Sequence, residues 1–379
     1  MTQVGDQTRV PASFIRGGTS KAIFFRREHL PERQEDWVPI FLAAQGSPDP
    51  NGRQLNGMGG GISSLSKICV VGRSARPGVD IDYTFAQVSI RDSSVSFAGN
   101  CGNITSAVGP YAVDEGLVAA SDGPVTVALF NTNTSKRVDA KFQVIGGRAA
   151  VVGDTVIPGV AGSGSPVQLE FINPGGAGTG KLLPTGALVD TFEITGHGAV
   201  RASVVDAANL CCFVHAEDLG LTGIEMPEAL DQATALHAAL AEIGVQVLSR
   251  IGAEGSNRLR LIGFVSPAQA ATTLSGEPVA AKDANFTARM FSSGQPHRAL
   301  PLTSALCMAV ASRIEGTTVN AVARGVTGEA TRIATPSGVL TVAAAVTGGG
   351  LASVAEGASV FRTQRRLFDG GVYIPTQGA

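Results

Sequence analysis

Short runs of β-branched and other apolar residues, many of them bounded by glycine, recur along most of this 379-residue chain. Examples are residues 20–25 (SKAIFF), 66–72 (SKICVVG) and 338–348 (GVLTVAAAVTG). β-Branched residues favour strands, and glycine adopts the backbone angles that tight turns require. With 48 glycines in the chain, this pattern predicts a fold of strands and turns rather than a helical bundle. Further strands are expected within residues 83–92, 124–132, 139–145, 148–154, 166–172 and 204–216.

Two stretches of small residues have helical spacing and resemble each other. Residues 104–108 read ITSAV and residues 302–306 read LTSAL, an offset of 302 − 104 = 198 residues. Strand-like sequence flanks each stretch, so we predict two similar α/β halves, each with strands around one central helix. The first helix is expected to begin near Cys101 and the second near Thr303, with Gly116 as the C-cap of the first. A chance match in an Ala/Ser/Thr-rich chain is the alternative.

The length of the chain exceeds that of one typical domain. We predict a first half at residues 1–188 and a second half at residues 189–359. Residues 360–379 are expected to return to the first half. Residues 226–247 form the clearest amphipathic pattern and predict one long helix with Pro227 near its start.

Charge and composition exclude several classes of protein. The net charge is −2 with no block of like charge, so a nucleic-acid surface is not expected. No apolar run approaches the roughly 20 residues that cross a bilayer, and the N-terminus lacks the apolar core of a signal peptide. A cytoplasmic protein is therefore expected. Neither metal-ligand spacing nor a dinucleotide fingerprint is present, which predicts no metal and no cofactor. The five cysteines are scattered and are expected to be reduced: Cys69, Cys101, Cys211, Cys212 and Cys307.

Four glycine-rich or apolar segments gather polar side chains. They are residues 16–21 (RGGTSK), 57–67 (GMGGGISSLSK), 100–105 (NCGNIT) and 296–304 (PHRALPLTS). The third segment begins the first predicted helix, where free backbone N–H groups and the helix dipole attract anions and stabilise a thiolate. A substrate carboxylate could rest there without a metal.

Individual residues in these segments suggest roles. Gly102 would let a ligand approach the backbone, and Asn103 could cap the helix. Lys67 precedes the apolar sequence ICVV, so its stem is expected to enter the protein, where a desolvated amine can act as a general base. A solvated lysine at the end of a turn and an ordinary buried thiol at Cys101 are the alternatives. The GMGGG run lacks the spacing of nucleotide-binding loops.

Taken together, the segments resemble the PrpF-type isomerases. That family includes 2-methylaconitate cis-trans isomerase, oxalomesaconate isomerases, methylitaconate Δ-isomerase and aconitate isomerases. The matching motifs cover nearly the whole chain in order: RGGTSK, NGMGG…SSLSK, NCGNITSAVG, LLPTG, EDLGLTG, HRA…T, TPSG and RTQRRLFDG. The resemblance implies a diaminopimelate-epimerase-like fold, with the active site in a cleft between two pseudo-symmetric halves. It also implies that Lys67 and Cys101 are catalytic.

One departure from the wider superfamily concerns the second thiol of the two-base epimerases. With the offset of 198 residues, Cys101 corresponds to Ala299, so racemisation by two thiols is not expected. Cys211 and Cys212 lie in an apolar run and are assigned to packing, as is Cys307. The residues expected to bind substrate are Arg16, Ser20, Lys21, Ser64, Ser66, Asn100, Gly102, Asn103, Lys181, Thr185, His297, Arg298, Thr303 and Ser304.

The expected function is a cofactor-independent isomerase of a small unsaturated di- or tricarboxylate such as 2-methylaconitate or aconitate. Lys67 would remove an allylic proton, and helix N-termini would stabilise the resulting dienolate. Cys101 either transfers a second proton or only orients the substrate. The alternatives are an oxalomesaconate-type tautomerase or Δ-isomerase and a non-catalytic accessory protein that binds carboxylates. No nucleic-acid or membrane partner is expected, and a homodimer is left open.

Overall fold

The computed structural model describes residues 1–253, 259, 261–328 and 330–376, and it divides into two compact units. Unit 1 comprises Met1–Leu169 and Phe361–Ala379, and unit 2 comprises Glu170–Val360. The divisions fall within strands β10 (Val167–Ile172) and β21 (Val354–Arg362). The glycine-rich segment 173–186 therefore belongs to unit 2, where Asp206 accepts hydrogen bonds from the backbone N–H groups of Gly178 and Thr179.

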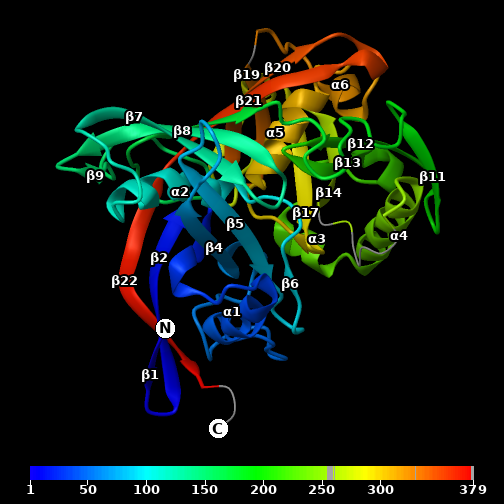
Figure 1. The fold of residues 1–379 in the computed structure, drawn as a ribbon. Helices are drawn as coiled ribbons and strands as arrows, with labels where there is room; N and C mark the ends of the chain where they lie inside the picture. Colours follow the sequence, from blue (N-terminus) through cyan, green and yellow to red (C-terminus); the bar gives the residue numbers. More distant parts are fainter. Residues whose placement is uncertain (254–258, 260, 329, 377–379) are drawn as a thin grey trace. The chain divides into compact units, whose positions relative to one another are not determined.

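Unit 1 is a strand-rich fold with one helix on each face of its sheet (Figure 1). Its helices are α1 (Trp37–Gln45) and α2 (Gly102–Asp114). Its strands are β1 (Thr2–Val4), β2 (Gln7–Gly17), β3 (Ser20–Arg26), β4 (Lys67–Arg73), β5 (Ile81–Val88), β6 (Val95–Ser96), β7 (Gly123–Asn131), β8 (Lys136–Ile145), β9 (Arg148–Ala149) and β22 (Gln364–Pro375). The C-terminal β22 pairs antiparallel with β2, and the two run side by side in Figure 1.

Both faces of the β3–β4–β5 sheet are buried, which explains why these strands read as continuous apolar runs. Alternate residues such as Ile68 and Val70 pack in one cluster with Phe41 of α1. On the opposite face, Tyr83 of β5 hydrogen-bonds Thr105 of α2. Side chains alternate between faces along a strand, so α1 and α2 cover opposite faces.

Helix α2 is the central helix of unit 1, and its residues from Gly102 to Val113 are all buried. Gly109 lets the helix approach the sheet closely. A Cβ at this position would lie 3.0 Å from the Cβ of Ala140 and 3.0 Å from the Phe142 ring. The predicted start of the helix near Cys101 is confirmed.

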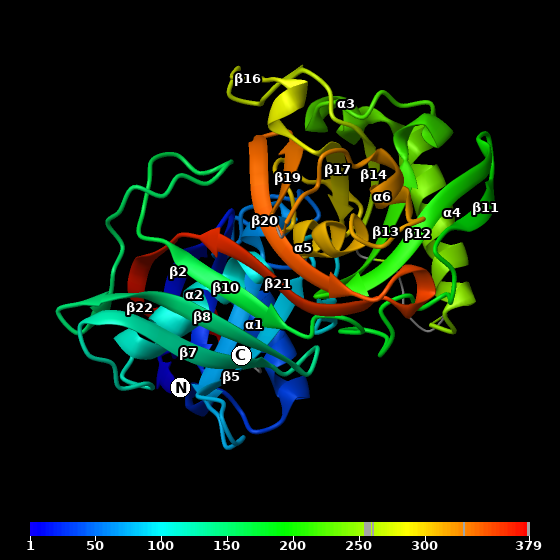
Figure 2. The same cartoon turned by 90° about the horizontal axis from the view of Figure 1, so that it is seen from above.

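Unit 2 contains helices α3 (Pro227–Gln232), α4 (Thr234–Arg250), α5 (Leu302–Ala311) and α6 (Thr318–Val322). Its strands are β11 (Asp190–Ile194), β12 (Gly198–Ala207), β13 (Asn209–His215), β14 (Leu261–Pro267), β15 (Ala271–Thr272), β16 (Pro278–Val279), β17 (Phe286–Ser292), β18 (Gln295–Pro296), β19 (Ala330–Thr335) and β20 (Gly338–Thr347). Helix α5 is buried from end to end, and Figure 2 shows it enclosed by strands of this unit.

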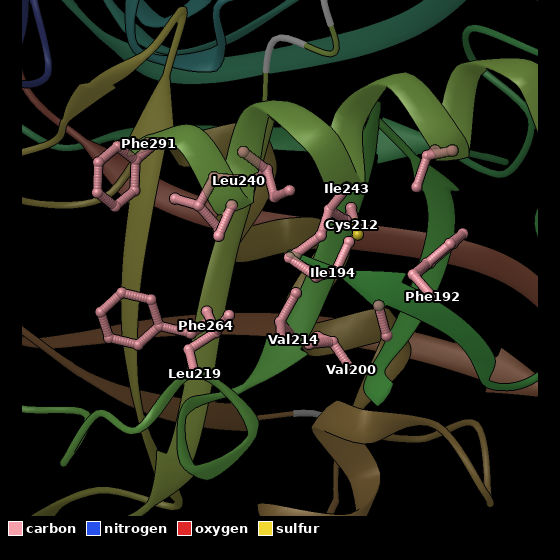
Figure 3. Packing of buried hydrophobic residues seen from close by; sticks show 14 of the residues in the cluster. Phe192, Ile194, Val200, Cys212, Val214, Leu219, Leu240, Ile243, Phe264 and Phe291 are labelled. Carbon is pink, nitrogen blue, oxygen red and sulfur yellow. The ribbon is translucent and has the colours of Figure 1, made fainter. Parts of the chain in front are cut away.

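Helix α4 covers the outer face of the unit 2 sheet. Leu240 and Ile243 of α4 pack in one cluster with Val214 and Phe264 of the strands (Figure 3). The prediction of one continuous helix over residues 226–247 is wrong, because the chain breaks between α3 and α4. At the break, the carbonyl of Leu230 is bound by the backbone N–H of Ala233 and by the His237 ring.

The two units repeat one sequence of strand pairings. In unit 1 the steps β2–β3, β3–β4, β4–β5, β5–β7 and β7–β8 alternate antiparallel and parallel. In unit 2 the steps β12–β13, β13–β14, β14–β17, β17–β19 and β19–β20 alternate in the same way. The central helix follows the third step in each unit. The predicted pair of similar halves, each with strands around one helix, is confirmed.

Other expectations for local structure differ from the observed elements. Residues 148–154 were expected to form a strand, but only Arg148–Ala149 pair with β8. Residues 150–154 instead begin the glycine-rich loop 150–166. The strand within residues 83–92 ends at Val88. Within the described residues, no helix is long and apolar enough to cross a membrane.

Candidate active site

Lys67 is the first residue of β4, and its side chain is only 6% exposed. The Nζ atom donates a hydrogen bond to Oε1 of Gln87 at 2.6 Å and lies 5.1 Å from the centroid of the Phe85 ring. The stem therefore enters the protein, as its apolar neighbours predict. The solvated alternative is wrong for this residue.

Gln87 fixes the position of the Lys67 amine, although no motif identified it. It faces Lys67 across the antiparallel β4–β5 pair. Its Nε2 atom donates to the carbonyls of Ser63 at 3.0 Å and Ser66 at 2.9 Å. These two bonds orient the amide so that its oxygen faces Nζ. The pairing register of the strands is the signal that could have found this residue.

Cys101 stands at the N-cap of α2 and is partly exposed, whereas the other four cysteines are buried. Its side chain makes no capping hydrogen bond to the helix. Cys69, two residues after Lys67 on the same face of β4, lies close enough to interact electrostatically with Cys101. Burial, with a smaller contribution from Cys101, raises the pKa of the Cys69 thiol well above its ordinary value. Cys69 and Lys67 thus point to the same face of β4.

Buried hydrogen bonds hold the start of α2 in place. The Oδ1 atom of Asn100 accepts hydrogen bonds from Tyr83, Thr105 and Asn131, at distances between 3.1 and 3.3 Å. The Thr105 hydroxyl also lies 3.1 Å from the carbonyl of Cys101. Asn100 therefore anchors the residue before Cys101 to the core.

Asn103 lies inside the first turn and does not cap α2, so that expectation is wrong. The N-cap is Cys101, which leaves Asn103 free to bind outside the helix. Its Nδ2 donates to the Thr19 hydroxyl at 3.1 Å, and its Oδ1 accepts from the Arg362 Nε at 3.1 Å. A Cβ on Gly18 would come within 2.1 Å of the same Oδ1. Glycine at this position lets the 17–19 turn approach the helix start.

The RGGTSK segment forms the β2–β3 turn beside this helix start. Arg16 donates from Nη1 to the carbonyls of Gly18 and Thr363, both at 3.0 Å, and so braces the turn. Burial, followed by nearby Arg365, lowers the pKa of Arg16. Ser20 is buried at the first position of β3, while the half-buried Lys21 places Nζ 5.5 Å from the Phe14 ring centroid.

The two predicted serines before Lys67 have different surroundings. Ser64 is half-buried in the short 3₁₀ turn Ser63–Leu65. Ser66 is fully buried, where its hydroxyl donates to the carbonyl of Val88 at 3.0 Å and accepts from Gln54 at 2.7 Å. The contacts of Ser66 are those of a residue that stabilises the turn before Lys67.

In unit 2, the predicted polar residues at the start of α5 are tied to β13. Thr303 accepts a hydrogen bond from Asn209 Nδ2 at 2.8 Å. Ser304 lies 3.7 Å from the sulfur of Cys211. Both hydroxyls are buried. The predicted packing role of Cys211 agrees with its position between the sheet and α5.

The remaining predicted residues of unit 2 lie in loops. His297 accepts a hydrogen bond at Nδ1 from the backbone N–H of Ala299 at 3.1 Å. Arg298 is 53% exposed and forms an ion pair with Glu228. Lys181 is exposed and Thr185 is half-buried, in the loop before β11.

Metal-ligating side chains do not gather in the described part of the chain. No group of three or more His, Cys, Asp or Glu residues there could hold a metal ion. Lys67, Cys101 and the start of α2 give unit 1 an amine, a thiol and a helix N-terminus. Such groups can accept a proton, return a proton and stabilise an anion.

The chain is similar to known proteins over nearly its whole length. The family model described as "PrpF protein" matches residues 7–375. The chain is 39% identical over 381 residues to the 3-methylitaconate isomerase of Eubacterium barkeri, with 98% of each covered. It is 37% identical to the 2-methyl-aconitate isomerase of Shewanella oneidensis, over 97% of this chain and 98% of the relative.

Solved structures extend the likeness to the fold. The crystal structure of methylitaconate-delta-isomerase matches with a TM-score of 0.78 and 38% identity, covering 98% of this chain and 97% of that one. A hydroxyproline epimerase from Agrobacterium vitis matches with a TM-score of 0.59 at 11% identity, over 99% and 95% of the two chains. That second match concerns the fold alone, and it agrees with the expected epimerase-like fold.

Proposed function

Because this chain belongs to the PrpF protein family, we propose that it isomerises a small unsaturated polycarboxylate by moving an allylic proton. Relatives named for methylitaconate and 2-methylaconitate support this class of substrate. Both names describe acids with a C=C bond next to carboxylates. In such acids the proton on the neighbouring carbon is the one whose removal shifts the double bond.

The observation that carries the proposal is the environment of Lys67. Its amine is buried, and the amide of Gln87 fixes its position on the face of the sheet that packs against α2. In its neutral form the amine has a lone pair that can accept a proton while an N–H group bonds to Gln87. We assign Lys67 as the general base.

The start of α2 supplies the complementary electrostatics. When Lys67 takes the allylic proton, the C–H electrons pass into the C=C–carboxylate system as a dienolate. The N-terminal N–H groups of α2, near Gly102, stabilise that charge without a metal ion. Reprotonation at the other end of the allyl system moves the double bond, and rotation before reprotonation exchanges cis and trans isomers.

We assign the second proton to Cys101. Its thiol protonates the dienolate, and a proton transfer from the Lys67 ammonium to the resulting thiolate restores the starting state. Partial exposure distinguishes Cys101 from the buried thiols and gives it access to a substrate. Residues 297–304 of unit 2 were predicted to bind a second carboxylate, and this role remains a prediction.

The test is an NMR assay in D₂O with purified protein and a panel containing trans-aconitate, 2-methylaconitate, methylitaconate and oxalomesaconate. Deuterium entry at the allylic carbon together with product formation is expected for at least one acid. Tight binding of the acids without exchange would instead support the accessory-protein alternative. Keto–enol exchange of oxalomesaconate alone would support the tautomerase alternative.

A further inference from the structure

Unit 1 contains a buried cation that has no counter-charge. Arg362, the last residue of β21, is 3% exposed. Its Nε donates to Asn103 Oδ1 at 3.1 Å and its Nη1 to the carbonyl of Phe361 at 3.0 Å. Across the described residues 1–253, 259, 261–328 and 330–376, no carboxylate pairs with it and no acceptor binds its Nη2.

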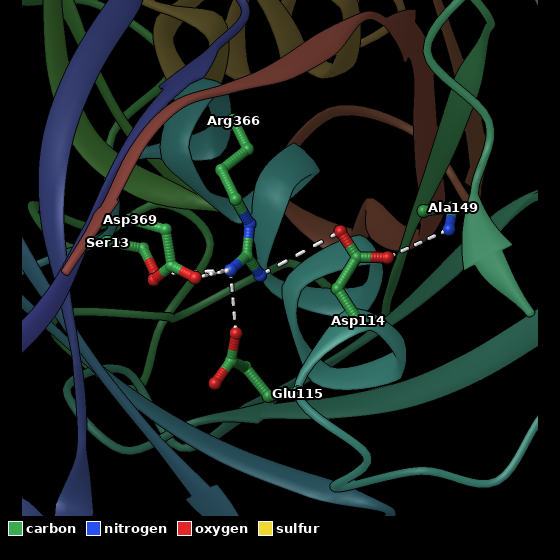
Figure 4. Close-up of polar contacts among 6 residues, drawn as sticks. All are labelled: Ser13, Asp114, Glu115, Ala149, Arg366 and Asp369. Carbon is green, nitrogen blue, oxygen red and sulfur yellow. Dashed lines mark hydrogen bonds and ion pairs between the residues drawn. The ribbon is translucent and has the colours of Figure 1, made fainter.

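A second arginine, on the next strand along the chain, is partly exposed and has carboxylate partners. Arg366 binds Glu115 at 2.7 Å and Asp369 at 3.3 Å, and it lies 3.8 Å from Asp114 (Figure 4). A buried charge is unfavourable unless an opposite charge compensates for it. Three carboxylates do so for Arg366, whereas only neutral oxygens bind Arg362.

Arg362 contacts the first turn of α2 through Asn103. Its partner Asn103 lies in the first turn of that helix, whose free N–H groups and dipole favour an anion. Burial lowers the pKa of the Arg362 guanidinium to about 9, and no carboxylate offsets this effect. The group is nonetheless largely protonated at pH 7.

The RGGTSK turn fixes this geometry. The backbone N–H of Thr19 and the Nε of Arg362 converge on the same Asn103 oxygen. A Cβ on Gly18 would come within 3.1 Å of the Arg362 Cδ. The side chain is thereby held in one orientation beside the first turn of α2.

We propose that Arg362 and the first turn of α2 form a binding site for one carboxylate of the substrate. Nη2 and the N–H groups of the helix start donate to its two oxygens. Asn103 acts as a positioning residue that holds the guanidinium. This inference rests on the proposed function, because it names the residues that recognise the carboxylate class of substrate.

The test compares Arg362→Gln with the matched control Arg366→Gln. The probe is tricarballylate, which has three carboxylates but no C=C bond and so reports binding alone. By calorimetry, Arg362→Gln should weaken tricarballylate binding by about 10- to 100-fold, the range of a charge-assisted hydrogen bond. KM for the isomerised acid should rise by a similar factor, with a smaller change in kcat. Arg366→Gln should lower Tm and leave tricarballylate affinity within twofold of wild type.

A second variant covers the case in which Arg362→Gln does not fold. Asn103→Asp places a carboxylate beside Arg362, so the variant should remain folded and lose tricarballylate affinity by at least tenfold. Wild-type affinity in a folded Arg362→Gln or Asn103→Asp protein would overturn the proposal. The proposal would also be overturned if wild-type protein isomerised unsaturated acids but did not bind tricarballylate. Absence of both binding and isotope exchange in wild-type protein would instead refute the proposed function itself.

Discussion

The two units share a fold but differ at matched positions around their central helices. The β4–β5 pair of unit 1 joins Lys67 to Gln87, and the corresponding β14–β17 pair of unit 2 joins Leu261 to Ser292. The residue proposed as the base in the first unit is thus matched by an apolar, buried leucine in the second. The fold is duplicated, but the residue proposed as the base is not.

The starts of the two central helices, α2 and α5, also differ. The N-cap of α2 is Cys101, whereas the N-cap of α5 is Pro301, which has no thiol. At the start of α5, Asn209 binds Thr303 from the neighbouring strand, so both polar groups are already partnered. The comparison is consistent with the proposal that the proton-transferring residues lie in unit 1.

The largest effect should come from removing the thiol. Cys101→Ala should lower kcat by about 10²-fold or more, because the second proton carrier is lost. Cys211→Ala in unit 2 is the matched control, since that thiol is buried against Ser304. It should lower Tm and leave kcat within twofold of wild type. Full activity of Cys101→Ala, measured by steady-state kinetics, would remove the thiol from the mechanism.

A smaller effect is expected from the amide that holds Lys67. Gln87→Leu should lower kcat by about tenfold, because Nζ loses the acceptor that positions it. Gln87→Asn keeps an amide oxygen on a shorter side chain, so it should recover part of the loss. Ser292→Ala, at the matched position of unit 2, should not change kcat. Equal losses in Gln87→Leu and Ser292→Ala would contradict the asymmetry of the units.

The smallest expected effect is on the free energy of unfolding at acid pH, and it concerns the last residues of the matched strands β3 and β13. His215 ends β13, at the position that Arg26 holds in β3. Burial, with a contribution from Arg201, lowers the pKa of His215, and Asp218 and Glu217 oppose this shift. The unfolded chain therefore binds the proton more readily as pH falls below about 6.5, and the free energy of unfolding decreases.

Denaturant unfolding of His215→Gln between pH 7 and pH 5 should accordingly show a weaker pH dependence than wild type. The difference is expected to appear as pH falls below about 6.5, the ordinary pKa of histidine. Arg26→Gln should keep the wild-type pH dependence, since arginine does not titrate in this range. A pH dependence unaffected by His215→Gln would show that this histidine is not the sensitive group.

Local sequence predicted the elements whose signals are contained in a few neighbouring residues. Both central helices begin close to the predicted residues: α2 begins at Gly102 for a start expected near Cys101, and α5 begins at Leu302 for a start expected near Thr303. The buried stem of Lys67 followed from the apolar residues after it. By contrast, the break at Ala233 depends on the His237 ring binding a carbonyl, which no helical periodicity records.

The partners of the candidate site could not be predicted in this way. Arg362 meets Asn103 across 259 residues of sequence, and Gln87 meets Lys67 through strand register. Ser66 looks like a ligand-binding serine in the sequence, yet Gln54 and Val88 occupy its hydroxyl. Such contacts depend on which elements become neighbours, and only the folded chain settles that.

Isotope exchange by Lys67→Met tests the central claim most directly, because it isolates proton removal from every later step. Wild-type protein and the unit 2 control Leu261→Met should exchange the allylic hydrogen of the substrate with D₂O at equal rates. Lys67→Met should exchange it at least about 10²-fold more slowly, the typical contribution of a general base. Wild-type exchange rates in a folded Lys67→Met protein would show that another group removes the proton, and the assignment of the chemistry to Lys67 would be wrong.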